Sequence, residues 1–179
     1  MFFRKKASVP DFAELLIRLH ARRYSYDSLL SILNKSGITL EDSWSANALI
    51  EWLILGCYLV RTGVAGNCNA NPKLRNAILD VFFGKLYAGL SDYGFREEEL
   101  PQLEEDIRLR FSEYDGKMSG QTRDPLIGGF GLSVAKHILE RSEVAADATP
   151  TRLAMIAVAH FGDSASLVGD LFKRFRIAD

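Results

Sequence analysis

Apolar side chains recur at intervals of three and four residues along most of the 179-residue chain. This spacing places them on one face of an α-helix, whereas the alternation typical of a half-buried strand is scarce. Residues that favour helix ends interrupt the pattern: Ser8 and Pro10, Gly37, and Asn71 with Pro72. We predict about seven helices: one that begins after Ser8, others over residues 26–35, 43–62, 72 to about 91, 97–114 and 132–142, and one from Pro150 to about Phe175.

The helix predicted over residues 43–62 is apolar around most of its circumference. Only a narrow stripe on it is polar, and this stripe consists of Asn47, Glu51, Tyr58 and Arg61. A helix this apolar is expected at the centre of a bundle. Its most apolar part, residues 48–60, is shorter than the roughly 20 residues that a membrane span needs. The pattern therefore predicts an all-α, single-domain helical bundle around this central helix, without a membrane span.

Two segments lack helical periodicity. Residues 1–8 precede the first helix, and we expect them to be flexible. Residues 115–131 hold five glycines and one proline, and structureless stretches of this length are usually functional or mobile. We therefore expect a mobile loop over residues 115–129. No internal repeat and no linker divides the chain, so residues 1–179 are expected to form one domain.

The helix predicted over residues 97–114 carries opposite charges on its expected outer face. Glu104 and Arg108 are four residues apart, as are Asp106 and Arg110. Opposite charges at this spacing pair on the surface of a helix. The sequence thus predicts an ordinary surface helix, with both arginines directed towards solvent.

Charge and cysteine content restrict the class of protein. The chain has 22 basic and 23 acidic side chains, and the resulting net charge of −1 gives no overall attraction to nucleic acid or to anionic membranes. Its two cysteines are too few for a disulfide framework. The basic N-terminal residues are followed by an apolar stretch that Asp11, Glu14 and Arg18 interrupt, unlike that of a signal peptide. We expect a cytoplasmic protein in a reducing setting.

Basic residues nevertheless gather near both ends of the chain. They are Arg4, Lys5, Lys6, Arg18, Arg22 and Arg23 near one end, and Lys173, Arg174 and Arg176 near the other. If the two ends meet in space, these residues form a modest cationic patch. Solvated chain ends are the alternative, and this is the interpretation we favour.

Residues 26–54 have the layout of a helix-turn-helix. However, the second helix presents Trp44, Trp52, Leu53 and Ile54, whereas a recognition helix needs polar and basic side chains for the major groove and the phosphates. Binding to nucleic acid is therefore not expected from this segment.

No catalytic motif occurs in the chain. Candidate binding residues are Glu51, Tyr58 and Arg61 on the central helix, with His160 on the apolar stripe of the last helix. The alternative for Glu51 is that it faces solvent or pairs with Arg61 or another base, and for His160 that a backbone carbonyl satisfies it. We favour both alternatives. The three histidines and two cysteines lack the spacing of a metal site, so neither a metal nor a cofactor is expected.

The stretch GGFGLSVAKHILE, residues 128–140, leads from the glycine-rich segment into a predicted helix. It resembles the second glycine box of the histidine-kinase-type ATPases, in which a G-x-G-L-x-L pattern precedes a helix whose amino end faces the nucleotide phosphates. The resemblance implies a nucleotide-binding loop at residues 128–132, with Gly129, Gly131 and Leu132 in the box. That family also has an Asp-x-Gly-x-Gly box and a multi-stranded sheet, neither of which this sequence shows. The favoured interpretation is a flexible entrance to an amphipathic helix.

The function that the sequence favours is non-catalytic protein interaction or scaffolding, because apolar packing residues far outnumber convergent polar groups. The last helix carries a second apolar edge, formed by Ala154, Phe161, Val168 and Phe172. Burial of this edge by a second copy or by another protein would make it an interface, although the protein's own helices could also fill it. The alternative function is a small-molecule-binding protein or an enzyme with a site between helices.

Overall fold

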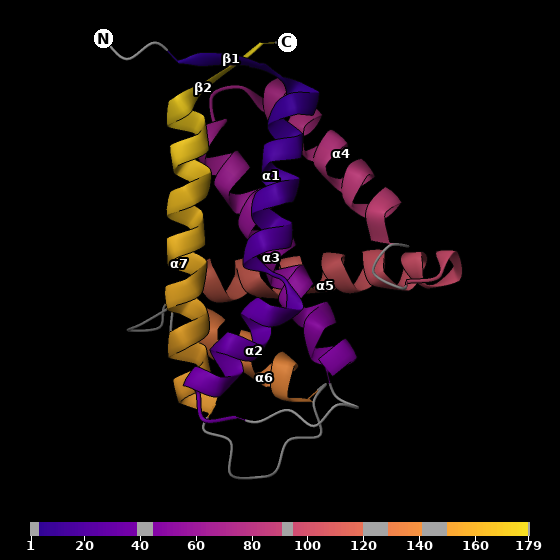
Figure 1. The fold of residues 1–179 in the computed structure, drawn as a ribbon, viewed down its shortest axis with the longest axis vertical. Helices are drawn as coiled ribbons and strands as arrows, with labels where there is room; N and C mark the ends of the chain where they lie inside the picture. Colours follow the sequence, from indigo (N-terminus) through magenta and orange to yellow (C-terminus); the bar gives the residue numbers. More distant parts are fainter. Residues whose placement is uncertain (1–3, 39–44, 91–94, 120–128, 141–149, 179) are drawn as a thin grey trace.

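A computed structural model describes residues 4–38, 45–90, 95–119, 129–140 and 150–178. In these residues the chain forms seven α-helices and a two-stranded sheet, which confirms the all-α fold (Figure 1). The helices are α1 (Val9–Arg23), α2 (Tyr26–Lys35), α3 (Ser45–Asn67), α4 (Pro72–Gly89), α5 (Leu100–Ser119), α6 (Leu132–Glu140) and α7 (Pro150–Arg174). The strands are β1 (Lys5–Ser8) and β2 (Phe175–Ala178).

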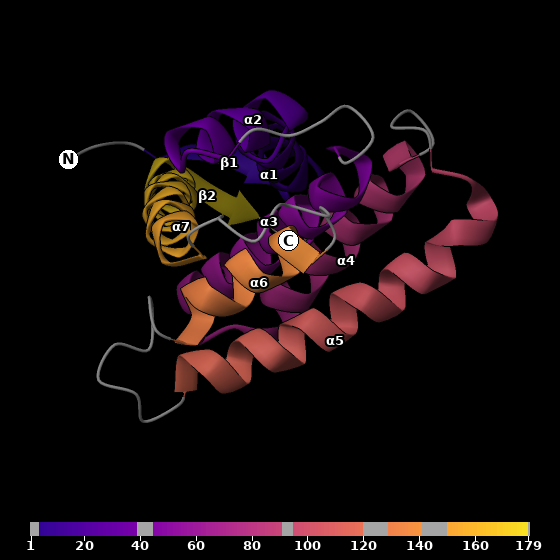
Figure 2. The ribbon, with the colours of Figure 1, turned by 90° about the horizontal axis from the view of Figure 1, so that it is seen from below.

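Helix α3 occupies the centre of the bundle, as its apolar circumference predicts. Seen along the bundle, it lies between α1 and α2 on one side and α5 and α6 on the other, with α4 and α7 at its flanks (Figure 2). Every residue from Glu51 to Val60 is buried. The helix is five residues longer than predicted at its carboxyl end, because Gly63 and Gly66 do not interrupt it.

With this extension, residues Ala48–Asn67 are long and apolar enough to cross a membrane by length and composition, the one such helix among the described residues. The core helix of a soluble protein passes the same test. In this structure, 67% of the apolar window is buried inside the bundle. The contacts of α3 with the surrounding helices therefore account for its composition.

The residues predicted to begin and end helices do so. Ser8 accepts a hydrogen bond from the backbone N–H of Asp11, whose side chain reaches back to Ser8, and this forms a capping box on α1. The side chain of Asn71 accepts from the backbone N–H of Leu74 at 3.0 Å. Gly37 follows α2 with a φ of 77°, a conformation that costs glycine little. The following N–H, of Ile38, then donates to the carbonyl of Leu33 at 2.9 Å.

The two ends of the chain pair with each other, which the sequence analysis did not predict. Strands β1 and β2 are parallel, with Lys6 opposite Arg176 and Ala7 opposite Ile177, and they lie across one end of the bundle (Figure 1). The expectation that residues 1–8 are flexible is therefore wrong for Lys5–Ser8. Residues 1–3 lie outside the described part. Each strand has only four residues, too few for alternation to identify it.

Helix α5 also differs from its prediction. It continues to Ser119, so residues 115–119 belong to a helix rather than to a mobile loop, and residues 120–128 lie outside the described part. The predicted outer charge pairs are replaced as well. Arg108 pairs with Glu105, and Arg110 turns inward to a carboxylate on α3.

Close packing of α1 on α3 depends on a glycine. A Cβ atom at Gly56 would lie 2.6 Å from the His20 ring and 2.7 Å from the Tyr24 ring. We expect Gly56→Ala to lower the free energy of unfolding by about 1–3 kcal/mol, because the core must shift to admit the methyl group. Gly66 lies on the same helix with nothing within 4 Å, so Gly66→Ala should be neutral or stabilise by up to about 1 kcal/mol. Urea unfolding of the two variants measures this difference, and equal effects would contradict the close approach.

Candidate functional site

Glu51, the first candidate on the polar stripe, is 1% exposed and is paired inside the protein. Arg110 of α5 donates two hydrogen bonds to it, from Nε to Oε2 at 3.1 Å and from Nη2 to Oε1 at 3.0 Å. This is the internal pairing that the sequence analysis favoured, with Arg110 as the base instead of Arg61. A bidentate pair of this kind fixes α5 on α3.

Tyr58 and Arg61 meet a different partner. The hydroxyl of Tyr58 donates to Asp115 Oδ1 at 3.0 Å, and the Arg61 guanidinium also donates to the Asp115 carboxylate. Burial, together with the neighbouring Asp115, raises the pKa of Tyr58 to about 12. The Arg61 guanidinium lies over the Phe111 ring at 4.8 Å. These contacts hold α5 against α3 and leave Tyr58 neutral.

His160 is satisfied by a backbone carbonyl, as favoured. Its Nε2 lies 2.9 Å from the carbonyl oxygen of Arg23, and its Nδ1 lies 3.3 Å from Arg23 Nη2. The first contact needs a proton on Nε2 and the second an unprotonated Nδ1, so the partners assign the neutral tautomer. Burial and the Arg23 charge lower its pKa to about 4. Its ring packs on Trp52, so His160 joins α7 to the core.

The four candidates therefore do not form one site. Glu51 contacts Arg110. Tyr58 and Arg61 both contact Asp115. His160 contacts Arg23. Each of these contacts joins two elements of the fold, so the residues have structural roles. The four residues do not form a reactive cluster between the helices.

The predicted apolar interface on α7 is not on the surface. Ala154 and Val168 are fully buried and Phe161 is 9% exposed, while the half-buried Phe172 packs on Phe12 with ring centroids 4.7 Å apart. The prediction of an interface here is wrong, because α7 buries this edge against α3, α6 and the other helices of the same chain. Association through another surface stays a prediction.

Two polar groups that the sequence analysis did not combine lie close together in the fold. Glu113 of α5 accepts hydrogen bonds from Ser133 and, at 2.8 Å, from His137 of α6. Burial raises the pKa of Glu113, but these two hydrogen bonds and the charges of His137 and Arg110 together outweigh it and hold the pKa below its usual value. Ser133 donates to the carboxylate and not to the imidazole, so the order differs from that of an activated serine. The group clamps α6 onto α5.

Cys57 and His20 are also neighbours, with Sγ 3.7 Å from Nε2. Burial raises the pKa of Cys57 to about 12 and lowers that of His20 to about 4. A reactive thiolate needs the opposite shifts, so both groups are neutral members of the core. No cluster of three or more metal-binding side chains occurs among the described residues.

The glycine-rich stretch does not form an open phosphate loop where the structure describes it. Residues 129–131 make a helical turn that leads into α6, and all three are buried. Phe130 packs on Tyr58, Tyr114 and Phe161. A Cβ at Gly129 would lie 3.1 Å from the backbone oxygen of Lys117, so the close approach of the turn before α6 to the end of α5 accounts for this glycine. The sheet that the resemblance implies is reduced, in the described part, to the terminal pair β1 and β2.

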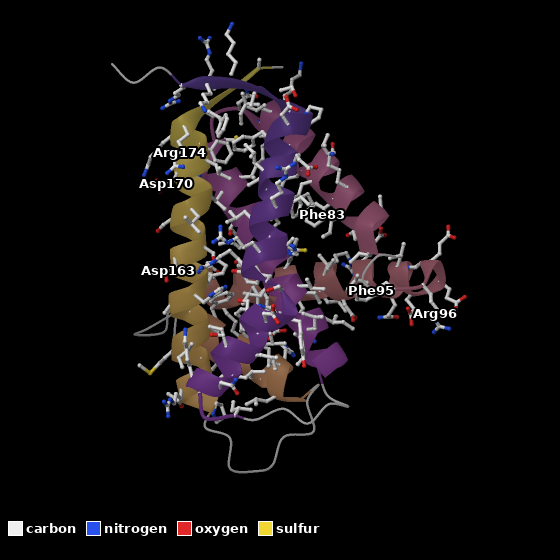
Figure 3. The ribbon with its side chains drawn as sticks, viewed as in Figure 1. Phe83, Phe95, Arg96, Asp163, Asp170 and Arg174 are labelled. Carbon is white, nitrogen blue, oxygen red and sulfur yellow. The ribbon has the colours of Figure 1, made fainter. Side chains whose placement is uncertain are left out.

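The paired chain ends create a different candidate site, which we call the cationic end. It consists of Arg4, Lys5, Lys6, Lys173, Arg174 and Arg176, all exposed. Side chains that end in nitrogen project from this end of the molecule, above the labelled Arg174 (Figure 3). The parallel register places Lys6 directly opposite Arg176. Like charges in such positions repel each other.

Few acidic partners of these cations occur in the part of the chain that the structure describes. Lys173 pairs with Asp170 at 3.0 Å, and the nearby Asp11 is hydrogen-bonded to Ser8. The other five cations of the cationic end form no ion pair with any residue that the structure describes. Three basic residues predicted to gather here do not join the cationic end. Arg18 pairs with Glu14. Arg22 and Arg23 lie in the last turn of α1, at the opposite end of the helix from β1, and Arg23 donates to Ser164.

Two adjoining pockets open at the cationic end. The larger has a volume of about 650 Å³ and lies between β1, α1 and the carboxyl end of α7. Its lining combines apolar and cationic side chains: Arg4, Lys5, Leu15, Leu171, Lys173, Arg174 and Phe175. The smaller, of about 250 Å³, shares Arg4 and Phe175 with it and extends to Arg176 and Ile177. The sequence identified the cations as a possible patch but did not place Leu15, Leu171 or Phe175 beside them. These apolar residues lie next to the cations only because the terminal sheet pairs the two chain ends.

Comparisons of the chain with protein-family models, with curated proteins and with solved structures find no match. The function is therefore inferred from the geometry and charge of the molecule itself.

Proposed function

We propose that this protein is a non-catalytic interaction domain whose cationic end binds an acidic segment of another protein. The observation that carries the proposal is the parallel pairing of the two chain ends, which gathers cations around an apolar pocket. Among the described residues, Lys173 is the one cation of this pocket that has an ion pair. The overall net charge is only −1, so the attraction is local to this end and can orient a partner on it.

Electrostatic repulsion supports this proposal. The fold holds Lys6 against Arg176 and places Arg4 and Lys5 beside Arg174 around one pocket. This arrangement costs stability in the free protein, and an acidic partner would relieve the repulsion on binding. Charge concentrated in this way is more typical of a binding surface than of a solvated chain end.

The apolar surface favours a protein partner over a membrane or a nucleic acid. The exposed large apolar residues of the described part are Tyr26, Leu109, Met118, Leu132, Met155 and Leu167. None of them lies in the strands or lines the two pockets, so the cationic end lacks the exposed anchors of a membrane-binding surface. Its strands have four residues each, about 13 Å at the usual rise, which spans few phosphates of a nucleic acid.

A cytoplasmic setting is part of the same proposal. Both cysteines are free and buried, which is typical of proteins in reducing compartments.

Charge reversal tests the proposed function. We expect the double variant Lys6→Glu, Arg176→Glu to weaken binding of a fluorescein-labelled glutamate-rich peptide at least about tenfold, because it replaces two attractive contacts by repulsive ones. Fluorescence anisotropy at low and at physiological salt measures this, and binding of the unaltered protein should weaken as salt rises.

The matched control is Lys117→Glu, Arg152→Glu, which changes the net charge equally. Arg152 lies near the start of α7, about 33 Å from Arg174 at the helical rise. Equal losses in both double variants would show that only net charge matters and would overturn the proposal. Tighter binding of a DNA duplex or of phosphatidylserine vesicles than of the peptide would also overturn it, in favour of those ligands.

A further inference from the structure

We propose that the acidic segment is anchored by one bulky apolar side chain, which enters the larger pocket while acidic residues on both sides of it contact the cationic rim. This inference rests on the proposed function and adds the recognised sequence: an aromatic or aliphatic residue flanked by Asp or Glu. A uniformly acidic surface would not fit the pocket in this way.

The pocket has an apolar floor. Leu15 comes from α1, Leu171 from the last turn of α7 and Phe175 from the start of β2. All three are half-buried, so their apolar atoms are available to a ligand while the rest of each side chain packs on the core. The volume of about 650 Å³ lies within the range of pockets that enclose small ligands and accommodates a large side chain.

The rim explains why acidic residues are needed on both sides of the anchor. Lys5, the first residue of β1, and Arg4, which precedes it, line one side of the pocket, whereas Lys173 and Arg174 line it from the end of α7. Three of these four cations have no ion pair with a described residue, and Lys173 already has Asp170. A segment that crosses the pocket from the β1 side to the α7 side therefore meets cations before and after its anchor.

An apolar anchor in a charged rim is a recurrent arrangement at protein interfaces. The buried anchor provides most of the affinity, and the surrounding charges set the orientation and the rate of association. A ligand with phosphates alone would leave the floor of Leu15, Leu171 and Phe175 exposed to water. Here the floor and rim together favour a mixed apolar and acidic sequence.

Two short labelled peptides test the anchor on the intact protein. One has a phenylalanine between two pairs of glutamates, and the other has alanine in its place, so the charges are identical. We expect the phenylalanine peptide to bind at least about tenfold more tightly, because only its ring fills the pocket. Equal affinity of the two peptides would overturn the anchor. If the two peptides bind equally and both bind more weakly to the double variant Lys6→Glu, Arg176→Glu, the proposed function stands without the anchor. If neither peptide binds the unaltered protein, the proposed function itself fails.

A neutral change in the floor locates the anchor. Leu171→Gln should reduce the preference for the phenylalanine peptide to below about threefold while affinity for the alanine peptide is retained, which also shows that the variant is folded. The control is Leu167→Gln, one turn earlier on α7 at a position that is 41% exposed and outside the pocket. Leu15→Gln gives a second floor variant from α1 if Leu171→Gln does not fold. An unchanged preference in a folded floor variant would place the anchor elsewhere and overturn the inference.

Discussion

Replacing Trp52 by alanine is expected to lower the free energy of unfolding by about 3–5 kcal/mol, the range for large aromatic residues that leave a cavity in a core. Trp52 is fully buried on α3. Its ring contacts Tyr24 and His160, with centroids 5.1 Å and 5.0 Å away. The side chain thus joins the central helix to the end of α1 and to α7 at one point.

Guanidinium unfolding followed by circular dichroism measures this loss. The control is Met155→Ala on α7, where the side chain is 53% exposed and the expected change is below about 0.5 kcal/mol. A loss below about 1 kcal/mol for Trp52→Ala would mean that the tryptophan is exposed, and α3 would then not be the centre of the bundle.

A comparable loss is expected for Arg110→Met, which removes the guanidinium from the buried Glu51 carboxylate. Breaking a buried pair from one side typically costs about 3–5 kcal/mol. Glu51→Gln should cost less, about 1–2 kcal/mol, because the Arg110 side chain is 20% exposed and also lies 3.8 Å from Glu113. The asymmetry follows from burial: Glu51 is enclosed, whereas Arg110 reaches solvent.

The double variant Glu51→Gln, Arg110→Met completes a thermodynamic cycle. We expect it to lose less stability than the sum of the two single variants, with a coupling of at least about 1 kcal/mol between the residues. Additive losses in urea unfolding would show that the two side chains do not interact, and this would remove the ion pair that joins α5 to α3.

The sequence predicts the helices well because their signals are local. The capping residue Ser8, the terminating glycine Gly37 and the cap Asn71 act within one turn of the chain, and the apolar circumference of α3 indicates its central position directly. The strands escaped prediction because four residues carry too little alternation. Their pairing joins Lys5 to Phe175, and no local pattern contains that information.

Long-range pairing also explains why the ion pair between Arg110 and Glu51 was not predicted. Arg110 has an acidic residue four positions earlier, Asp106, so the local pattern assigned both to the outer face. The buried Glu51, 59 residues away, attracts Arg110 more strongly because a carboxylate enclosed by the core needs a charged partner. Sequence spacing alone could not choose this partner for Glu51.

The two predicted surfaces had opposite outcomes for a related reason. The apolar edge of α7, with Phe161 and Val168, showed only that something must cover it, and helices of the same chain do. The cations at the chain ends were interpreted as solvated, but β1 and β2 bring Lys6 and Arg176 side by side. In both cases the sequence correctly identified which residues share a surface, apolar on α7 and basic at the chain ends. It did not show which other part of the chain lies against that surface.

The measurement that tests the central claim most directly is a titration of the ¹⁵N-labelled protein with the glutamate and phenylalanine peptide, followed by amide chemical shifts. The account predicts that the perturbed signals come from residues 4–8 and 170–178, and from Leu15. Perturbations centred on Glu51, Tyr58 and Arg61, or no perturbation at an excess of peptide, would contradict the assignment of the cationic end as the binding surface.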